Sequence, residues 1–264
     1  MHIFDQDWIA RLLVIAEEAA FAVNAIYHRK IYRIDSKLDN SPVTEADLRA
    51  HEIIKTGLLN LEPTLPLLSE EGEQVPAETR FNWSKFWLVD PLDGTKGFIR
   101  KTGEFTINIA LIENHQPIVG VIGVPQLGHY YWAIRGKGAY FRHSGVEKKL
   151  QTTFHSPARV VVSRRNYQKE QVDQWAARLG GYQLNYCSSS LKICWVANGE
   201  MDLYPQMGKT SEWDTAAGQC ILEAAGGQLV DVKGVPLQYN THSFLENPPF
   251  YAISDNRLMT ILCG

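Results

Sequence analysis

Two aspartates three residues apart directly follow an apolar segment, in the run Trp87–Thr95 with the sequence WLVDPLDGT. The proline of this run fixes its own φ angle and lacks an N–H, and the glycine can take positive φ, so the turn is rigid. Such a turn could aim the carboxylates of Asp90 and Asp93 and the carbonyl of Leu92 at one point. Oxygen ligands that converge in this way suit a hard cation, Mg²⁺ or Mn²⁺. The alternative is an Asx turn that only ends a strand.

Further carboxylates lie at the ends of predicted elements. Glu70 and Glu71 end another apolar strand. Asp214 stands just before a predicted helix, and Asp47 follows Thr44 by three residues. Each has a structural alternative: a solvated strand end for the glutamates, an N-cap for Asp214 and a capping box for Asp47. Together they offer several carboxylates at element ends, where functional sites are usually built.

Carboxylates gathered in one place repel one another, and each raises the pKa of its neighbours. Divalent cations relieve this repulsion, and two of them about 3.5–4 Å apart can hold both the attacking water and the leaving oxygen of a phosphoryl transfer. The sequence contains no Cys/His zinc pattern, no His-Glu-x-x-His and no Gly-x-x-x-x-Gly-Lys-Ser/Thr. A zinc site and the use of ATP by a P-loop are therefore disfavoured.

Hydrophobic periodicity predicts two helices in the first part of the chain, over residues 7–28 and 44–60, the second with Thr44 as its N-cap. Short apolar strands are then predicted at residues 65–68, 86–89, 105–112, 118–124 and 130–134. Turn signals separate the last three strands. This pattern favours an antiparallel sheet covered by helices.

The pattern changes near Ser156, after which predicted strands and helices alternate. The strands fall at residues 160–162, 184–187 and 203–204. The helices fall at residues 167–179, 190–197 and 215–225. Such alternation indicates an α/β half. We therefore divide the chain into an α+β half at residues 1–155, with most of the expected metal ligands, and an α/β half at residues 156–264, which closes the site and supplies Asp214.

The composition is that of an ordinary globular protein, with 264 residues, 45% hydrophobic residues and a formal net charge of −3. The acidic balance argues against a nucleic-acid-binding protein. Every apolar stretch is shorter than ten residues, so no transmembrane segment is predicted. The N-terminal segment is acidic where an export signal would be basic, and the four cysteines form no Cys-x-x-Cys pair. A cytoplasmic location with reduced thiols is therefore expected, while the oligomeric state is not predicted.

The segment Trp87–Thr95 resembles the Asp-Pro-Ile/Leu-Asp-Gly-Thr signature of the inositol monophosphatase superfamily. The segment Trp213–Gly218 resembles the second signature, Trp-Asp-x-Ala-Ala-Gly. The Glu-Glu pair after Ser69 and the Thr-x-x-Asp at Thr44–Asp47 fall in the family's order and spacing. The resemblance implies an α+β fold, a layered αβαβα sandwich, and the activity of a Mg²⁺-dependent, lithium-sensitive phosphatase.

Within the superfamily, four stretches are similar to the bacterial CysQ branch, at residues 41–44, 87–96, 103–112 and 188–192. That branch comprises 3′(2′),5′-bisphosphate nucleotidases. The resemblance implies hydrolysis of adenosine 3′,5′-bisphosphate (PAP), a by-product of sulfate assimilation, to AMP and phosphate by direct attack of water. The alternatives are an inositol monophosphate or sugar-phosphate phosphatase of the same superfamily and, in another class, a non-catalytic phospho-ligand or metal sensor.

The resemblance also implies which residues hold the metal. Glu70, Asp90 and the Leu92 carbonyl would bind a first Mg²⁺, and Asp90, Asp93 and Asp214 a second. The family allows a third, weaker Mg²⁺ near Glu70. Four of these residues would also contact the substrate, namely Glu70, Leu92, Asp93 and Asp214.

Catalytic and substrate-binding roles follow from the same resemblance. Thr95, paired with Asp47, would position and deprotonate the attacking water. The backbone N–H groups of Gly94 and Thr95 would hold phosphate oxygens at the start of a short helix. Ser189 and Lys192 would contact the nucleotide, the lysine supplying charge for its second phosphate. The alternative for Lys192 is a solvated lysine on a helix.

Two positions depart from the pattern of the branch. Gly97 stands where the branch usually has Glu, and Gln206 stands where it commonly has Arg. Gln206 cannot supply the charge or the two-pronged grip of a guanidinium, so affinity for the second phosphate is expected to be weaker or to come from Arg164 or Arg165. Members of the branch associate peripherally with the cytoplasmic face of the inner membrane, but no basic amphipathic helix predicts this here.

Overall fold

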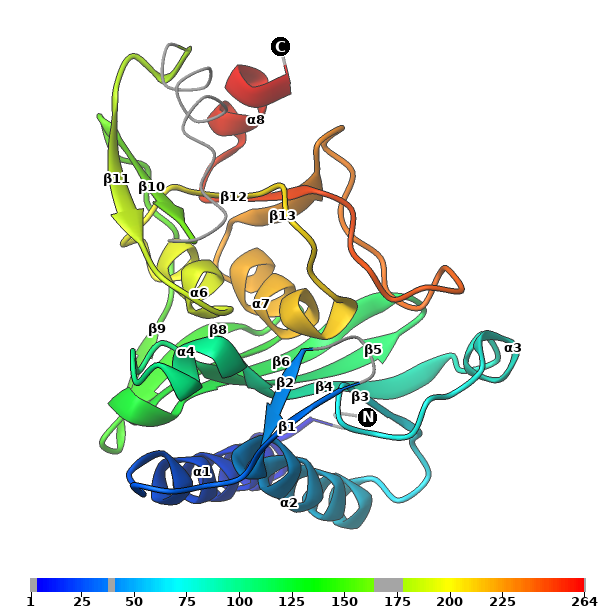
Figure 1. Ribbon diagram of the computed structural model, residues 1–264. Helices are drawn as coiled ribbons and strands as arrows, with labels where there is room; N and C mark the ends of the chain where they lie inside the picture. The colour runs from blue at the N-terminus through cyan, green and yellow to red at the C-terminus, as the bar shows by residue number, and fades with distance from the viewer. Residues whose placement is uncertain (1–3, 38–40, 164–177, 264) are drawn as a thin grey trace.

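The computed structural model has five layers, in the order helix, sheet, helix, sheet, helix (Figure 1). The structure describes residues 4–37, 41–163 and 178–263. The first layer, drawn in blue, covers one face of a large sheet, and helices from the second half of the chain cover its other face. The αβαβα sandwich expected from the resemblance is therefore confirmed. Most of the helix predicted at residues 167–179, together with Arg164 and Arg165, lies outside the described residues.

The outer helical layer consists of α1 (Gln6–Tyr27) and α2 (Glu45–Leu61), so both predicted helices are confirmed. The Asp5 carboxylate begins α1 by accepting the backbone N–H of Trp8 at 2.8 Å. Helix α2 begins after Thr44, as predicted. The apolar stripes of the two helices face the sheet and each other.

The large sheet holds seven strands in the order β3-β4-β5-β6-β7-β8-β9. Their bounds are Leu67–Ser69 (β3), Lys85–Asp93 (β4), Thr106–Glu113 (β5), Gln116–Val124 (β6), His129–Ile134 (β7), Gly138–His143 (β8) and Val146–Lys149 (β9). All neighbouring pairs are antiparallel except β3 with β4, which is parallel. Strands β8 and β9 were not predicted. Strand β9 is an exposed edge strand with a polar sequence, so it gives no apolar pattern.

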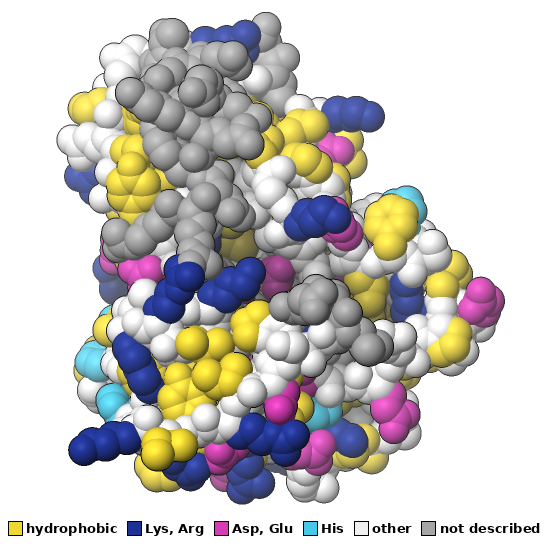
Figure 2. All heavy atoms as spheres, viewed as in Figure 1, with side chains coloured by type: hydrophobic (Ala, Val, Ile, Leu, Met, Phe, Trp, Pro, Cys, Tyr) yellow, Lys and Arg dark blue, Asp and Glu magenta, His cyan; other side chains and the backbone are white. Residues whose placement is uncertain are grey.

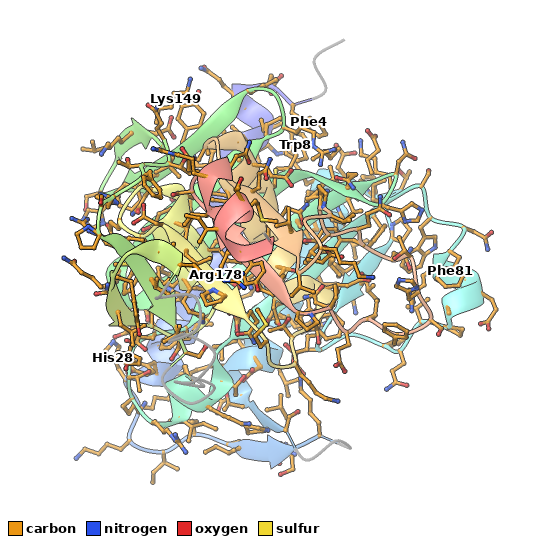
Figure 3. All side chains as sticks on the ribbon, turned by 90° about the horizontal axis from the view of Figure 1, so that it is seen from above. Phe4, Trp8, His28, Phe81, Lys149 and Arg178 are labelled. Atoms are coloured by element: carbon orange, nitrogen blue, oxygen red, sulfur yellow. The ribbon has the colours of Figure 1, made fainter. Side chains whose placement is uncertain are left out.

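The position of β4 between two hydrophobic cores explains why its sequence is continuously apolar. Phe86 and Leu88 pack in the core shared with the helices of the second half, whereas Trp87 and Val89 pack against the first helical layer. Both faces of the strand are thus buried, so alternation with polar residues is lost. On the outer side, Trp8 of α1 stacks on Trp87 with ring centroids 6.0 Å apart. Phe4 meets the edge of Trp8 at 4.6 Å (Figure 3).

Several short elements connect the large ones. A two-stranded ribbon of β1 (Ile34–Ser36) and β2 (Pro42–Thr44) precedes α2. The helices α3 (Ala77–Arg80) and α4 (Thr95–Ile99) and a 3₁₀ turn (η1, Pro125–Leu127) follow.

The second sheet has five strands in the order β11-β10-β12-β14-β13 and mixes parallel with antiparallel pairs. Its strands are Ala158–Val162 (β10), Tyr182–Tyr186 (β11), Leu203–Gln206 (β12), Gln228–Asp231 (β13) and Phe250–Ile253 (β14). Helices α6 (Leu191–Ala197) and α7 (Glu212–Ala224) lie between the two sheets, and α8 (Asn256–Cys263) lies on the outer face. Strands β13 and β14 and helix α8 were not predicted.

Small residues allow α7 to lie very close to the large sheet. A Cβ atom added at Gly120 of β6 would lie 2.4 Å from the carbonyl oxygen of Ala217, and one at Gly218 would lie 2.8 Å from Ile193. The backbone of α7 therefore leaves room only for glycine at Gly120, whereas Gly218 faces the flexible Ile193 side chain of α6. The backbone of α7 at Ala217, within the second signature, therefore lies directly against strand β6 of the large sheet. Among the described residues, no helix combines the length and the apolar character needed to cross a bilayer.

Candidate active site

Three carboxylates from two distant segments meet where β4 ends. Asp90 and Asp93 lie on β4 and Asp214 in the first turn of α7, and one oxygen of each lies within 4.8 Å of the others. The register of β4 with β5 shifts between Asp90 and Asp93. Asp90 Oδ1 accepts the backbone N–H of Leu92 at 2.9 Å, which fixes the carboxylate in this irregular stretch. The convergence expected from the sequence is thus present for these three side chains.

Asp90 is buried, whereas Asp93 and Asp214 are partly exposed at the cavity, and the proximity of the three groups shifts the pKa of two of them. Burial raises the pKa of Asp90 well above its ordinary value, and the charges of Glu70, Asp93 and Asp214 raise it further. Burial and then the charge of Asp93 likewise raise the pKa of Asp214. Ionised carboxylates in such a place need a balancing cation, because each disfavours the charged form of its neighbours.

The donors present fit a hard divalent cation. All three side chains offer carboxylate oxygens, which Mg²⁺ and Mn²⁺ prefer over the softer ligands. Asn108, the cross-strand neighbour of Asp90, has a buried Oδ1 without a hydrogen-bond partner in the described part of the chain. A hydrated cation would bring water donors that could satisfy such an acceptor.

Glu70 lies near this cluster and is held by a lysine that the sequence did not reveal. Lys37 Nζ lies 2.6 Å from Glu70 Oε1 and 2.5 Å from Glu71 Oε1. Burial raises the pKa of Glu71 to about 7, against the opposing effect of Lys37. Both glutamates therefore form ion pairs with Lys37, Glu70 partly buried and Glu71 largely buried. The alternative of a solvated strand end is wrong. Lys37 follows an exposed polar ribbon strand, where no sequence pattern marks it.

Asp47 serves two partners at once, one with each carboxylate oxygen. Its Oδ2 accepts the backbone N–H of Thr44 at 2.8 Å, which completes the capping box of α2. Its Oδ1 accepts the hydroxyl of Thr95 at 3.0 Å. Burial raises the pKa of Asp47, and the hydrogen bonds from Thr44 and Thr95 oppose that effect. The predicted pair and the capping-box alternative are therefore both present.

Thr95 opens the short helix α4, and Gly94 precedes it with a left-handed φ of 95°. A side chain at Gly94 would be strained, and its Cβ would lie 3.0 Å from the carbonyl oxygen of Glu104. The Leu92 carbonyl lies 3.2 Å from the Thr95 hydroxyl and offers it a second acceptor. The glycine of the first signature is thus required by the turn that presents Thr95.

Asp214 occupies the third position of α7, so the structural alternative of an N-cap is wrong. Ser211 is the N-cap, and its backbone N–H donates to Asp214 Oδ2 at 2.7 Å. The helix begins at Glu212, earlier than predicted, because this capping box adds a turn before Thr215.

A cavity of about 550 Å³ opens beside the cluster. Of the residues predicted from the sequence, its wall includes Glu70, Asp93, Gly94, Thr95, Ser189, Lys192 and Asp214. Asp47, Asp90 and Leu92 are buried, each with only 1% of its surface exposed, and lie outside this wall. Lys96, Arg100 and Lys209 line its rim, and Lys and Arg side chains gather on this face at the level of α4 (Figure 2).

Lys192 is not a solvated lysine. Only 3% of its surface is exposed, its Nζ donates to the Ser189 carbonyl at 2.7 Å, and it lies 4.8 Å from the Tyr204 ring centroid. Burial lowers its pKa, while the charges of nearby acids, Asp93 first, oppose that effect. Gln206 is also buried in this wall and accepts the Tyr204 hydroxyl at 3.1 Å. This part of the cavity wall therefore includes the buried ammonium group of Lys192 and the neutral amide of Gln206.

Known proteins share this arrangement of segments. Residues 7–262 match the inositol monophosphatase family. The chain belongs to that family. The 3′(2′),5′-bisphosphate nucleotidase CysQ of Escherichia coli (strain K12) is 44% identical over 237 residues, which cover 89% of this chain and 95% of that protein. The enzyme of the same name from Haemophilus influenzae is 35% identical over 248 residues, covering 93% and 92%.

Solved structures agree with the fold. CysQ from Bacteroides thetaiotaomicron superposes with a TM-score of 0.80 at 35% identity, covering 96% of this chain and 99% of that one. The inositol monophosphatase TM1415 of Thermotoga maritima gives a TM-score of 0.77 at 20% identity, covering 97% of each chain, and supports the fold alone. The family predicted from the sequence is confirmed.

Replacing Asp90 with Asn should stabilise the protein when metal is withheld. A carboxyl whose pKa is raised by folding lowers the free energy of unfolding as the pH rises, by about 1.4 kcal/mol per pKa unit. Asn resembles the neutral acid and avoids this loss. In EDTA at pH 8, the variant should therefore melt at least about 2 °C above the wild type, and the difference should shrink toward pH 5.

If Asp90 binds Mg²⁺, saturating Mg²⁺ should make the wild type the more stable of the two, because the ion then stabilises the folded wild type more than the variant. Thermal melts in EDTA and in Mg²⁺ at both pH values measure this. An Asp90→Asn variant that is less stable than the wild type in EDTA at every pH would contradict the repulsion described above.

Proposed function

We propose that this protein is a Mg²⁺-dependent phosphatase that hydrolyses PAP to AMP and phosphate in sulfate assimilation. The observation that carries the proposal is a cavity beside the carboxylate cluster whose wall includes Asp93, Asp214 and Thr95. The Thr95 hydroxyl donates a hydrogen bond to Asp47. The names of relatives 44% and 35% identical to the chain support the substrate. The free, buried thiols of Cys187, Cys194 and Cys220 fit the cytoplasmic location that we propose.

The carboxylates would hold the cations. We assign a first Mg²⁺ to Glu70, Asp90 and the Leu92 carbonyl, and a second to Asp90, Asp93 and Asp214, with a weaker third near Glu70. When bound, Mg²⁺ neutralises the cluster, lowers the pKa of water and stabilises charge on the leaving oxygen. The cost of holding three carboxylates this close together supports at least one cation here.

Thr95 and Asp47 would handle the proton. The Thr95 hydroxyl donates to Asp47 Oδ1, so its oxygen can accept a proton from a water molecule in the cavity. The carboxylate lies behind the wall and is kept in position by Thr44. A hydroxyl that relays a proton to a fixed, buried carboxylate is a suitable general base for direct attack by water, without a covalent intermediate.

Substrate contacts are assigned on the same wall. The backbone of Gly94 and Thr95 would hold the phosphate that is hydrolysed, and Ser189 and Lys192 would contact the second phosphate. The buried charge of Lys192 supports this assignment, because it has little competing solvent. The neutral side chain of Gln206 supports a lower affinity for the second phosphate than an arginine guanidinium would give.

The two halves of the chain would close the site together. Residues 1–155 carry Asp47, the β4 ligands and Thr95, and residues 156–264 carry Lys192 and Asp214. We propose that catalysis needs both halves, because neither holds the complete ligand set.

An inositol monophosphate or sugar-phosphate phosphatase is the second candidate. Gln206 favours this second candidate, because a neutral amide can hydrogen-bond to a sugar hydroxyl as readily as to a phosphate oxygen. A non-catalytic sensor is disfavoured, because such a protein would be expected to lack a ligand or the Thr–Asp pair. All six of the predicted metal-binding and catalytic side chains are present, namely Asp47, Glu70, Asp90, Asp93, Thr95 and Asp214.

A substrate comparison separates the candidates. A charged hydrogen bond from Lys192 contributes about 1.5–3 kcal/mol, so kcat/KM for PAP should exceed that for inositol 1-phosphate by at least about tenfold. Phosphate release with PAP, inositol 1-phosphate and fructose 1,6-bisphosphate, each with Mg²⁺, measures this, and the same reactions in EDTA serve as controls. A preference for the inositol or sugar phosphate would replace the nucleotidase assignment with the second candidate.

The Asp47→Asn variant tests the proton transfer. It keeps an acceptor for the Thr95 hydroxyl but cannot take a proton, so kcat should fall by about 10²–10⁴-fold. Thr44→Ala is the matched control, because it removes the Thr44 hydroxyl from Asp47 Oδ2 and weakens the cap of α2 by about 1 kcal/mol, but keeps the Thr44 N–H bond to Asp47 and the Asp47–Thr95 bond. Steady-state kinetics and chemical denaturation of both variants are compared. A kcat for Asp47→Asn within a few-fold of the wild type would exclude Asp47 as the base.

A further inference from the structure

The hydroxyl of Ser190 lies between the two segments that supply the carboxylate cluster. Its oxygen is 2.7 Å from Asp93 Oδ2 and 2.6 Å from the carbonyl oxygen of Asp214. The backbone N–H of Ser190 also donates to Asp93 Oδ2, at 2.6 Å. The side chain is buried, with 3% of the residue exposed, directly before helix α6. One residue thus contacts β4 and α7 from a third segment of the chain.

Asn108 determines which way the Ser190 hydroxyl points. Asn108 Nδ2 donates to Ser190 Oγ at 2.9 Å and lies 3.5 Å from the Trp213 carbonyl oxygen. A serine hydroxyl has one proton, and an oxygen that accepts from Asn108 directs this proton to its other neighbours. Those neighbours are the Asp93 carboxylate and the Asp214 carbonyl. Asn108 on β5 therefore supports the contact from the strand beside β4.

These contacts fix one oxygen of Asp93 and leave the other available. Both short contacts from Ser190 go to Oδ2, and the remaining donor to that oxygen is Thr106 at the longer distance of 3.5 Å. Oδ1 accepts no hydrogen bond within the described residues. The Asp93 side chain is therefore held in one rotation by Ser190, while its second oxygen can serve as a ligand.

We propose that Ser190 is a positioning residue that holds Asp93 and Asp214 in the relative geometry that a divalent cation requires, with Asn108 orienting its hydroxyl. This inference rests on the proposed function, in which both aspartates bind the cation. The groups that orient metal ligands typically change metal affinity by about 10–100-fold when they are removed. Ser190 acts through Asp93 and Asp214 and needs no contact with the phosphate.

The test is Mn²⁺ binding to the metal-free full chain, measured by isothermal titration calorimetry without substrate. Ser190→Ala should weaken the Mn²⁺ site by about tenfold or more. Asn108→Leu, of similar size, should weaken it in the same direction but less, because the Ser190 hydroxyl remains beside Asp93 and Asp214 and loses only the donor that orients it. In kinetics, Ser190→Ala should raise the Mg²⁺ concentration for half-maximal rate, while KM for PAP at saturating Mg²⁺ stays within about twofold.

Ser254→Ala is the matched control, because this serine is also buried and its hydroxyl lies 3.4 Å from a carboxylate oxygen of Asp202, outside the site. It should bind Mn²⁺ like the wild type. Binding by Ser190→Ala within twofold of the wild type, or an equal loss in Ser254→Ala, would overturn the role of Ser190 alone. If the wild type itself binds no Mn²⁺, the metal site of the proposed function fails together with this inference.

Discussion

Repulsion among closely spaced carboxylates is the constraint on which this structure depends. Asp90, Asp93 and Asp214 each place a carboxylate oxygen within 4.8 Å of the others, and this proximity, together with burial, raises the pKa of Asp90 and Asp214. Such an arrangement costs stability unless a cation balances it, and the protein brings the three together from segments more than a hundred residues apart in sequence. The close approach of α7 to Gly120 makes this possible. We interpret the strain as the cost of a site prepared for divalent cations.

The same local motif, a capping box, positions an aspartate of the site at the start of two helices. Helices α2 and α7 each begin with a capping box whose third residue is an aspartate, Asp47 in one and Asp214 in the other. One oxygen of each aspartate satisfies the backbone of the N-cap residue, and this fixes the side chain. The other oxygen of Asp47 holds Thr95. Structural and functional explanations of these aspartates are therefore complementary, since the cap supplies the rigidity that the site needs.

The sequence predicted what depends on local pattern and missed what depends on distant contacts. The helices α1 and α2, the strand β4 and the irregular stretch before Thr95 each have a strong local signal. Strand β9 lacks one, because an exposed edge strand has no buried face to impose alternation. Lys37 and Ser190 reach Glu70 and Asp93 only through the fold, so their roles could not be predicted. The third of three consecutive serines looked only like the start of a helix.

A crystal of the protein soaked in Mn²⁺ tests the central claim most directly. Anomalous diffraction at the manganese absorption edge locates the ions independently of any assumption about substrate. Our account predicts a strong peak bounded by the carboxylates of Asp90, Asp93 and Asp214, and its loss in a crystal of Asp93→Asn. The absence of a peak among these three carboxylates at saturating Mn²⁺, or an undiminished peak in Asp93→Asn, would contradict the account.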